Sequence, residues 1–437
     1  MGSSDSFVTV IGSGMAALGA DHRLRAGGLS ARLYDAADHP GGHTQTHVYE
    51  GGWAFDEGPH VSFTKDQRIQ ELFANAVDGD FQTLAANVDN YWGGHRFKHP
   101  AICNLFGLPT DLVVECISDF VEANSKSPES LNNYEDWLLT AYGRSFAETF
   151  PMEYAKKVHT TEASNLTTDW LGPRLYRPAL EEVLNGALSM ETPDVHYVTE
   201  YRYPSRGGFV AYLQPFLDQA EINLSHRLVS VDPKQRLLSF ANGAESLYQD
   251  LISTVPLPDF IPMIQGVPDE VVTAAARLAA TSMVLVNIGI DREDAGETWT
   301  YFYDQDLLFT RVSYPASFSS EMSPPGSSSF QAEIYFSAKY QPLTVTPESL
   351  IDEVVGDLRK TELIRNGDQV THQSALYVPY ANIIHDHDKL PALEVIFNYL
   401  EEIGIKTAGR YGLWGYQWTD EAFISGEEAA QDIIDER

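Results

Sequence analysis

The first thirty-five residues alternate short apolar runs with one amphipathic stretch. Phe7–Ile11 is an apolar run of the kind that forms a buried strand, and residues 29–35 form a second such run. Between them, residues 16–28 have the spacing of a helix that ends at the glycine pair Gly27–Gly28. The order strand, helix, strand predicts one βαβ unit of a parallel sheet at the start of the chain.

The hydrophobic pattern changes character along the rest of the chain. Residues 111–150 have helical spacing, and Asn132–Asn133 predicts a break or a cap within them. Residues 281–340 are rich in β-branched and aromatic side chains, which favour strands. Turns at Asp232–Pro233 and Asn242–Gly243 predict hairpins that lead into the buried strand "LISTVP". Because 437 residues exceed what one ordinary core holds, we expect two domains.

The turn after the first strand has the spacing G-x-G-x-x-A, formed by Gly12, Gly14 and Ala17. Gly12 permits a tight turn, Gly14 lets the backbone approach a pyrophosphate, and the small Ala17 allows close packing of helix on strand. The helix N-terminus then presents its positive dipole end to the phosphates. Asp35 lies 21 residues after Gly14, where an acid can accept hydrogen bonds from ribose hydroxyls. The whole unit predicts dinucleotide binding.

Two further motifs distinguish between dinucleotides. A Gly41–Gly42 turn follows Asp35, and "FDEGPH" follows at Phe55–His60. Residues 405–433 hold a strand, a Gly409–Arg410 turn and an amphipathic helix with small residues. Together these motifs resemble the flavoprotein superfamily that includes amine oxidases, protoporphyrinogen oxidase-like proteins and UDP-galactopyranose mutases. The resemblance implies bound FAD, held without a covalent link because neither cysteine falls in the C-terminal motif.

The resemblance also implies a fold and a set of cofactor contacts. The expected fold is α/β of the amine-oxidase type, in which a discontinuous Rossmann-like FAD-binding domain is joined to an α+β substrate domain. The FAD-binding domain would span residues 1–95, 200–260 and 370–437, and the substrate domain residues 96–199 and 261–369. The expected cofactor-binding residues are Gly12, Gly14, Met15, Ala16, Asp35, Gly41, Gly42, His43, Gly58, Pro59, His60, Val229, Gly409, Arg410 and Asp420.

Two branches of this superfamily differ in what the flavin does. No second G-x-G-x-x-G follows a strand to bind NAD(P)H, so the reduced flavin either passes its electrons to oxygen or another acceptor or returns them to the substrate. We favour an oxidoreductase in which hydride passes from a small-molecule metabolite to the flavin. The alternative is a redox-neutral enzyme acting on a sugar nucleotide, like UDP-galactopyranose mutase. A third hypothesis is a protein that binds a flavin as a scaffold and catalyses no reaction.

Local motifs resemble those of the mutase. "GPHVSFTKD" resembles its histidine loop, and "YDQDLLFTRVSYP" resembles the strand whose arginine grips the substrate diphosphate. The resemblance therefore gives His60, Arg311 and Tyr416 as catalytic residues. A pocket arginine suits an anionic partner, and the alternative role of Arg311 is an ion pair between strands. His159 and Trp418, however, stand where the mutase has a tryptophan and an acid, which puts a uridine-diphosphate sugar in doubt.

Charge and composition exclude several other functions. Because 62 acids against 29 bases give a net charge of −33, we expect neither nucleic acid nor an anionic membrane surface as a partner. No apolar run is long enough to span a bilayer, and without a signal peptide we expect a cytoplasmic protein. The "HDHD" run at 385–388 is expected to be solvated rather than to bind a metal. The sequence leaves the oligomeric state open.

Overall fold

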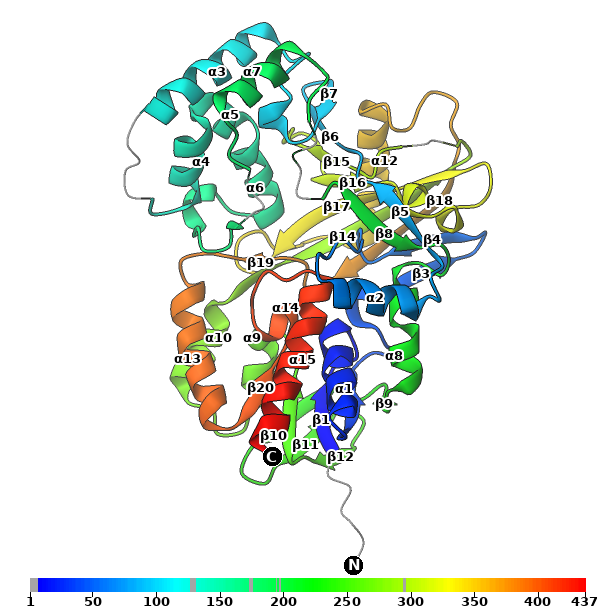
Figure 1. Cartoon of the computed structure of the whole chain (residues 1–437), viewed down its shortest axis with the longest axis vertical. Coiled ribbons are helices and arrows are strands. Elements are labelled where there is room, and N and C mark those ends of the chain that lie inside the picture. Colours follow the sequence, from blue (N-terminus) through cyan, green and yellow to red (C-terminus); the bar gives the residue numbers. More distant parts are fainter. Residues whose placement is uncertain (1–6, 126–130, 173–175, 194, 196–197, 294–295) are drawn as a thin grey trace, which may run out of the picture.

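A parallel sheet lies in the lower half of the molecule (Figure 1). The computed structural model describes residues 7–125, 131–172, 176–193, 195, 198–293 and 296–437. Within them, five parallel strands pair in the order β20-β13-β1-β2-β9. Their bounds are β1 Phe7–Ile11, β2 Ser30–Tyr34, β9 Ile222–Asn223, β13 Asp250–Ser253 and β20 Ile405–Thr407. This sheet therefore joins the predicted βαβ unit to strands from the middle and the end of the chain.

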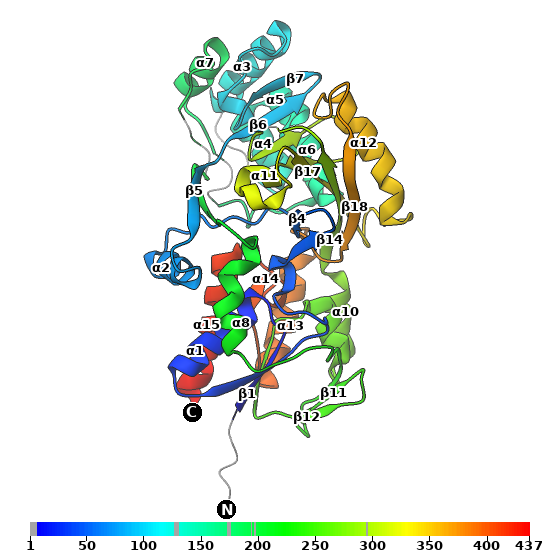
Figure 2. The ribbon, with the colours of Figure 1, turned by 90° about the vertical axis from the view of Figure 1, so that its right-hand side faces the viewer.

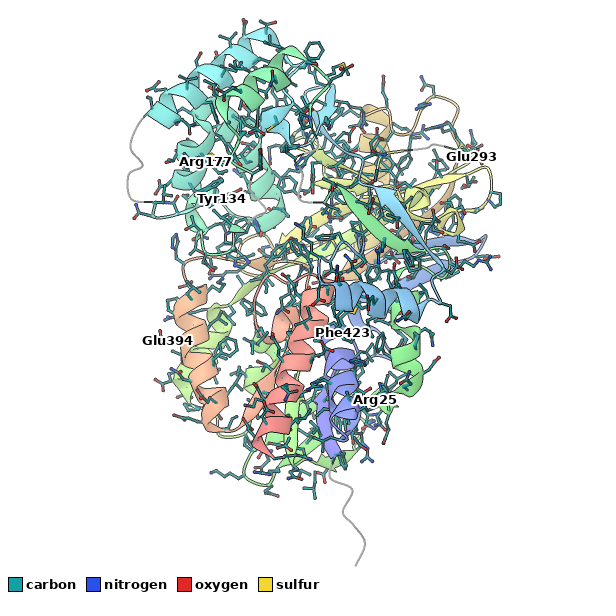
Figure 3. The ribbon with its side chains drawn as sticks, viewed as in Figure 1. Arg25, Tyr134, Arg177, Glu293, Glu394 and Phe423 are labelled. Carbon is teal, nitrogen blue, oxygen red and sulfur yellow. The ribbon has the colours of Figure 1, made fainter. Side chains whose placement is uncertain are left out.

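Two helices from opposite ends of the chain pack side by side next to this sheet (Figures 1 and 2). They are α1, Met15–Ala26, and α15, Thr419–Glu436. An added Cβ at Gly426 would lie 1.8 Å from the carbonyl oxygen of Ala16, and one at Gly19 would lie 2.0 Å from that of Phe423. Figure 3 shows Phe423 on α15, beside α1. The two glycines thus set the distance between the helices.

This contact gives a prediction for stability. Gly426→Ala is expected to lower the free energy of unfolding by about 1–3 kcal/mol, because the new methyl group can fit only if the helices move apart. The matched control is Gly356→Ala in α12 (Ile351–Lys360), where a Cβ would meet no atom within 4 Å. Alanine is the better helix former by about 1 kcal/mol, so the control should be neutral or stabilising. Urea unfolding of both variants tests this, and equal effects would contradict it.

A second, larger sheet lies above the first. Its strands run in the order β18-β14-β17-β16-β15-β6-β7, and β19 pairs with one end of β14. The predicted strands of residues 281–340 are its centre, where β14 is almost wholly buried because neighbouring elements cover both of its faces. The bounds are β6 Val88–Trp92, β7 His95–Lys98, β14 Ala279–Ile290, β15 Trp299–Phe302, β16 Arg311–Ser313, β17 Ser328–Ser337, β18 Val370–Val378 and β19 Ile383–Ile384.

A helical cluster occupies the top of the molecule in Figure 1. It contains α3 Thr110–Ser125, α4 Tyr134–Tyr142, α5 Arg144–Thr149, α6 Pro151–His159 and α7 Leu180–Leu188. The predicted cap is present, because the Asn133 side chain accepts a hydrogen bond from the backbone N–H of Asp136 at the start of α4. Aromatic side chains fill the core of this cluster, around the fully buried Phe150.

Shorter elements connect these parts. The predicted hairpins form a three-stranded sheet, β10-β11-β12, and two strand pairs, β3-β4 and β5-β8, stand apart from the large sheets. The strands are β3 Thr46–Tyr49, β4 Trp53–Asp56, β5 Phe81–Ala85, β8 Glu200–Pro204, β10 Leu228–Asp232, β11 Leu237–Phe240 and β12 Glu245–Leu247. The helices are α2 Gln67–Ala76, α8 Gln214–Gln219, α9 Leu257–Phe260, α10 Asp269–Arg277, α11 Pro315–Phe318, α13 Lys389–Glu402 and α14 Gly409–Gly412. The two-domain boundaries remain a prediction.

The prediction of a solvated run at residues 385–388 was wrong for its first half. His385 and Asp386 are buried, whereas the next two residues are exposed. Asp386 accepts hydrogen bonds from Lys339 Nζ at 2.8 Å and from Tyr340 Oη at 2.6 Å. The loop after β17 thus folds over the start of α13 and buries a charge that local alternation could not show. In the described part of the chain, no helix is long and apolar enough to cross a membrane.

Candidate cofactor and substrate site

One cavity of about 1220 Å³ runs between the two large sheets. This volume exceeds the roughly 300–1,000 Å³ of a pocket for a single small molecule. It therefore has room for a dinucleotide and a second molecule. Its walls come from distant parts of the chain. The lining residues fall within the ranges 11–16, 34–37, 41–44, 57–63, 226–229, 254–263, 378–382 and 409–422, and others lie on β14 to β17.

The cavity brings together almost all of the residues that the sequence singles out. The predicted residues that line it are Gly12, Gly14, Met15, Ala16, Asp35, Gly41, Gly42, His43, Gly58, Pro59, His60, Val229, Arg311, Gly409, Arg410 and Tyr416. The exception is Asp420, which follows the lining residue Thr419 in the first turn of α15. In the C-terminal motif, Trp414 belongs to the hydrophobic core, whereas Trp418 lines the cavity.

The glycine turn at the start of α1 forms a narrow cradle. Gly12 has a φ of +117°, and a Cβ there would lie 2.0 Å from Thr254 Oγ1, so only glycine fits. Gly14 approaches the second glycine turn, since its added Cβ would lie 3.5 Å from the Cα of Gly42. The first backbone N–H groups of α1 have no acceptor within the helix and lie at this cradle. A phosphate group is what such a cradle suits.

Asp35 lies directly after β2, at the carboxyl edge of the parallel sheet. Its carboxylate accepts hydrogen bonds from Ser13 Oγ at 2.6 Å and from the backbone N–H of Ala37 at 2.9 Å. Two bonds leave acceptor capacity on the carboxylate, which has about four lone-pair sites. Because Asp35 lines the cavity beside the glycine turn, its position suits the ribose hydroxyls of a dinucleotide.

His60 lines the cavity and directly follows the Gly58–Pro59 turn. Its Nδ1 is 3.1 Å from the carbonyl oxygen of Gly58. Because a carbonyl can only accept, Nδ1 carries the proton and Nε2 is left as an acceptor. Burial, together with the neighbouring His43 and Arg410, lowers the pKa of His60 to about 4. The imidazole is therefore neutral at pH 7.

This pKa predicts how stability depends on pH. Below the ordinary histidine pKa of 6.5 the unfolded chain binds a proton at this side chain, whereas the folded chain does not until about pH 4. The stabilisation is thus complete above pH 6.5 and is lost as the pH falls toward 4. His60→Gln should show a smaller fall in the free energy of unfolding over this interval than the native chain. Urea unfolding at pH 7 and pH 4.5 measures the difference, and parallel pH curves would contradict it.

A buried ion pair between strands lines the cavity. The sequence left such an ion pair open as the alternative role of Arg311, but it did not identify the partner. Arg311 on β16 lies opposite Glu333 on β17 in the strand register. Its Nε and one terminal nitrogen lie 2.9 and 2.8 Å from Glu333 Oε1, and Tyr335 Oη donates to the other carboxylate oxygen at 2.6 Å. The Glu333 side chain is 1% exposed and that of Arg311 is 23% exposed. A lone acid in the apolar run "FQAEIYF" is the sequence feature that could have identified Glu333 as this partner.

The C-terminal motif supplies part of the cavity wall. Arg410 donates to the carbonyl oxygens of Gln417 at 2.8 Å and Ala381 at 3.1 Å, and its guanidinium lies 4.9 Å from the ring centre of Tyr416. The side-chain oxygen Oε1 of Gln417 is buried, and among the described residues it has no hydrogen-bond partner. A buried acceptor at a cavity wall indicates a donor group on a ligand.

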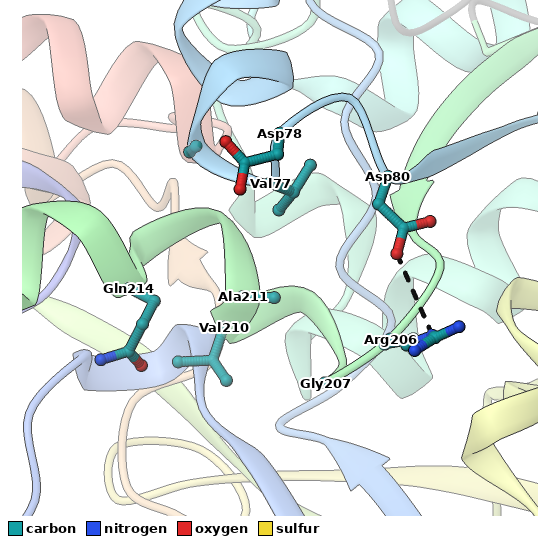
Figure 4. Close-up of a pocket in the computed structure, with 9 residues that line it drawn as sticks. Val77, Asp78, Asp80, Arg206, Gly207, Val210, Ala211 and Gln214 are labelled. Atoms are coloured by element: carbon teal, nitrogen blue, oxygen red, sulfur yellow. Dashed lines mark ion pairs between the residues drawn. The ribbon is translucent and has the colours of Figure 1, made fainter.

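A second pocket lies on the surface, between the end of α2 and the loop before α8 (Figure 4). Its volume is about 320 Å³. The charged groups in it are Asp78, Asp80 and Arg206, of which the last two form an exposed ion pair at 4.0 Å. The pocket shares no lining residue with the large cavity, and its charges are solvated. We therefore assign the site to the large cavity.

The known proteins that resemble this chain agree on its fold. Residues 10–76 match the family of NAD(P)-binding Rossmann-like domains. A reduced UDP-galactopyranose mutase superposes with a TM-score of 0.91 at 23% identity, over 99% of this chain and 96% of the other. A putrescine oxidase with redesigned cofactor binding gives 0.65 at 14% identity, over 99% of both chains. The chain has the expected amine-oxidase type of fold.

This amine-oxidase fold is also shared by a candidate protoporphyrinogen oxidase from Exiguobacterium. That protein gives a TM-score of 0.75 at 15% identity, and the match covers 100% of both chains. The residues of the cavity fit the cofactor that this fold suggests. The glycine cradle suits a diphosphate, Asp35 suits a ribose, and the unpartnered Gln417 Oε1 suits a donor group on the ligand.

Proposed function

We propose that the chain is an FAD-dependent oxidoreductase that takes a hydride from a small-molecule metabolite. The observation that carries this proposal is that one cavity is lined by the glycine cradle, by His60 and by the Arg311–Glu333 pair. Gly12, Gly14 and Asp35 would hold the dinucleotide. Bound FAD would supply the two-electron acceptor.

His60 is suited to manage the proton in this reaction. An alcohol or amine that gives up a hydride also loses a proton from its oxygen or nitrogen. The neutral His60 imidazole has its Nδ1–H donated to Gly58 and keeps Nε2 as a proton acceptor. Its low pKa keeps this nitrogen unprotonated at pH 7. Removing it should therefore slow substrate oxidation more than it weakens substrate binding.

The Arg311–Glu333 ion pair favours a substrate group that is neutral or carries a single charge. Glu333 already matches the charge of Arg311, so a doubly charged diphosphate would meet a carboxylate next to the guanidinium. Polar hydrogens of Arg311 can still orient a hydroxyl or a carboxylate. Phe63, Trp299 and Tyr416 also line the cavity, and their rings suit the apolar face of a small molecule.

The redox-neutral alternative is favoured by a different observation. The similarity to UDP-galactopyranose mutase, with a TM-score of 0.91, is stronger than that to the two oxidases compared. An enzyme of that kind would act on a sugar nucleotide with no net electron flow.

One experiment separates the two functions. The protein is purified with FAD, and its visible absorption is followed without oxygen while amines, alcohols and sugar nucleotides are added in turn. The oxidoreductase is expected to lose its flavin colour with one substrate class and to form hydrogen peroxide or reduce an added acceptor afterwards. His60→Gln should bleach at least tenfold more slowly with that substrate. Turnover of a sugar nucleotide only after chemical reduction would establish the alternative, and a colourless protein that binds no FAD would refute both.

A further inference from the structure

Arg311 and Arg410 both line the cavity, and they differ in what lies against their charges. Arg311 directs two of its nitrogens to the buried carboxylate of Glu333, at 2.9 and 2.8 Å. Arg410 donates instead to neutral acceptors, the carbonyl oxygens of Gln417 and Ala381. In the described part of the chain, no carboxylate lies within ion-pair distance of Arg410. One arginine of the cavity is therefore matched by a direct counter-charge, and the other is not.

The Arg410 guanidinium is held in place and still has hydrogen-bond donors for a ligand. A guanidinium carries five N–H donors. Two of them go to the carbonyl oxygens of Gln417 and Ala381, and one can go to the hydroxyl of Tyr411, which leaves two. The ring of Tyr416 covers one side of the guanidinium at 4.9 Å. Because these contacts fix its plane in advance, Arg410 is suited to bind a planar carboxylate through two parallel hydrogen bonds.

The acid on this part of the cavity wall is Glu57, and two histidines occupy it. His43 Nδ1 is 3.1 Å from one of its oxygens, and His47 Nε2 is 2.9 Å from the other. The β3-β4 hairpin brings these side chains together, because His47 is on β3 and Glu57 directly follows β4. Glu57 thus leaves the remaining N–H groups of Arg410 to a ligand in the cavity.

Arg410 also lies close to His60, the residue that we propose as the proton acceptor. Its charge is one of the causes that lower the pKa of the His60 imidazole. Both side chains line the same cavity, and Nε2 of His60 is the nitrogen left as an acceptor. An anionic group on Arg410 and an alcohol or amine on His60 would therefore belong to one small molecule.

We propose that Arg410, rather than Arg311, binds the anionic group of the substrate, which is a small monocarboxylate that also carries the alcohol or amine to be oxidised. The inference rests on the proposed oxidoreductase function and narrows its substrate class. The substrate would lose a hydride from carbon to bound FAD and a proton from oxygen or nitrogen to His60 Nε2, and would leave as an oxo acid or an imino acid. Arg410 would thereby determine specificity without taking part in the proton transfer.

The test uses two pairs of probes that differ in charge, benzoate with benzamide and propionate with propionamide. Their binding to the FAD-loaded protein is followed without oxygen from the change in visible flavin absorption. The native chain should bind the carboxylate of at least one pair roughly tenfold to a hundredfold more tightly than the matching amide. The same titrations are then made with variants of each arginine.

Arg410→Gln should remove the preference for the carboxylate and leave the affinity for the amide within about twofold, whereas a merely structural defect would weaken both probes. Arg410→Lys keeps the charge and should retain part of the preference. The double variant Arg311→Met with Glu333→Gln removes the other arginine together with its counter-charge and should retain it in full. Arg144→Gln, which breaks an exposed pair with Glu148, is the matched control and should change neither affinity.

Three results would overturn the inference while FAD binding stands. They are equal affinities of the native chain for carboxylate and amide, a preference that survives Arg410→Gln, and a preference that only the Arg311→Met, Glu333→Gln variant loses. The reduction potential of bound FAD is measured alongside. A lower potential in Arg410→Gln with an unchanged preference would show that this charge acts on the cofactor instead. A chain that binds no FAD would refute the proposed function together with the inference.

Discussion

Replacing Gly14 with alanine is expected to weaken FAD binding by roughly tenfold to a hundredfold without destabilising the apoprotein. Gly14 has a φ of −82°, which alanine adopts freely, and the new Cβ would make only an ordinary contact of 3.5 Å with Gly42. The methyl group would, however, occupy the cradle at which a diphosphate must approach the backbone. Fluorescence titration with FAD and thermal unfolding of the apoprotein measure the two effects separately.

The control for this prediction is again Gly356→Ala, which should change neither property by more than a small amount. Gly12→Ala makes a useful contrast, because its Cβ would lie 2.0 Å from Thr254 Oγ1 at a φ of +117°. Gly12→Ala should therefore lower the stability of the apoprotein as well as its affinity for FAD. Unchanged affinity in Gly14→Ala would show that the cradle does not hold the cofactor.

The second large effect is expected from Glu333→Ala. The substitution leaves the Arg311 charge without its partner in a mostly buried position and removes the acceptor of the Tyr335 hydroxyl. Breaking a buried ion pair by removing one member costs about 3–5 kcal/mol. Denaturant unfolding should therefore show a large loss of stability at neutral pH.

Two further variants show whether this loss comes from the unpaired charge. The double variant Arg311→Met with Glu333→Gln removes both charges and should recover most of the stability. Glu148→Ala breaks the exposed pair with Arg144 and should cost at most about 1 kcal/mol. If Glu333→Ala cost no more than Glu148→Ala, the buried pair would not stabilise the fold.

The parts of the site that depend on local backbone geometry could be predicted from the sequence. Gly12 and Gly14 are required by a turn whose shape follows from neighbouring residues, and Asp35 follows from the length of one βαβ unit. The Gly409–Arg410 turn was predicted from its resemblance to a motif of known flavoproteins. The structure places all five of these residues on one cavity.

The remaining features depend on strand register between distant segments. Arg311 meets Glu333 because β16 and β17 pair at that register, and β15 pairs with β6, which lies some two hundred residues earlier in the chain. Glu57 meets His47 only through the β3-β4 hairpin. Side chains alternate between the two faces of a strand, so the sequence indicates which of them share a face. It does not indicate which strand lies opposite. These partners therefore required the structure.

The pairing of α1 with α15 has a consequence for biosynthesis. Residues near Gly14 share a cavity with Arg410 and Thr419, which the ribosome adds about four hundred residues later. A nascent chain that has reached only the start of α13 has every residue of the cradle but lacks the part of the cavity wall that residues 409–422 supply. The FAD that we propose for this cavity can therefore be held only after those residues have been made, and a premature stop codon at position 405 is expected to give a protein that binds no FAD.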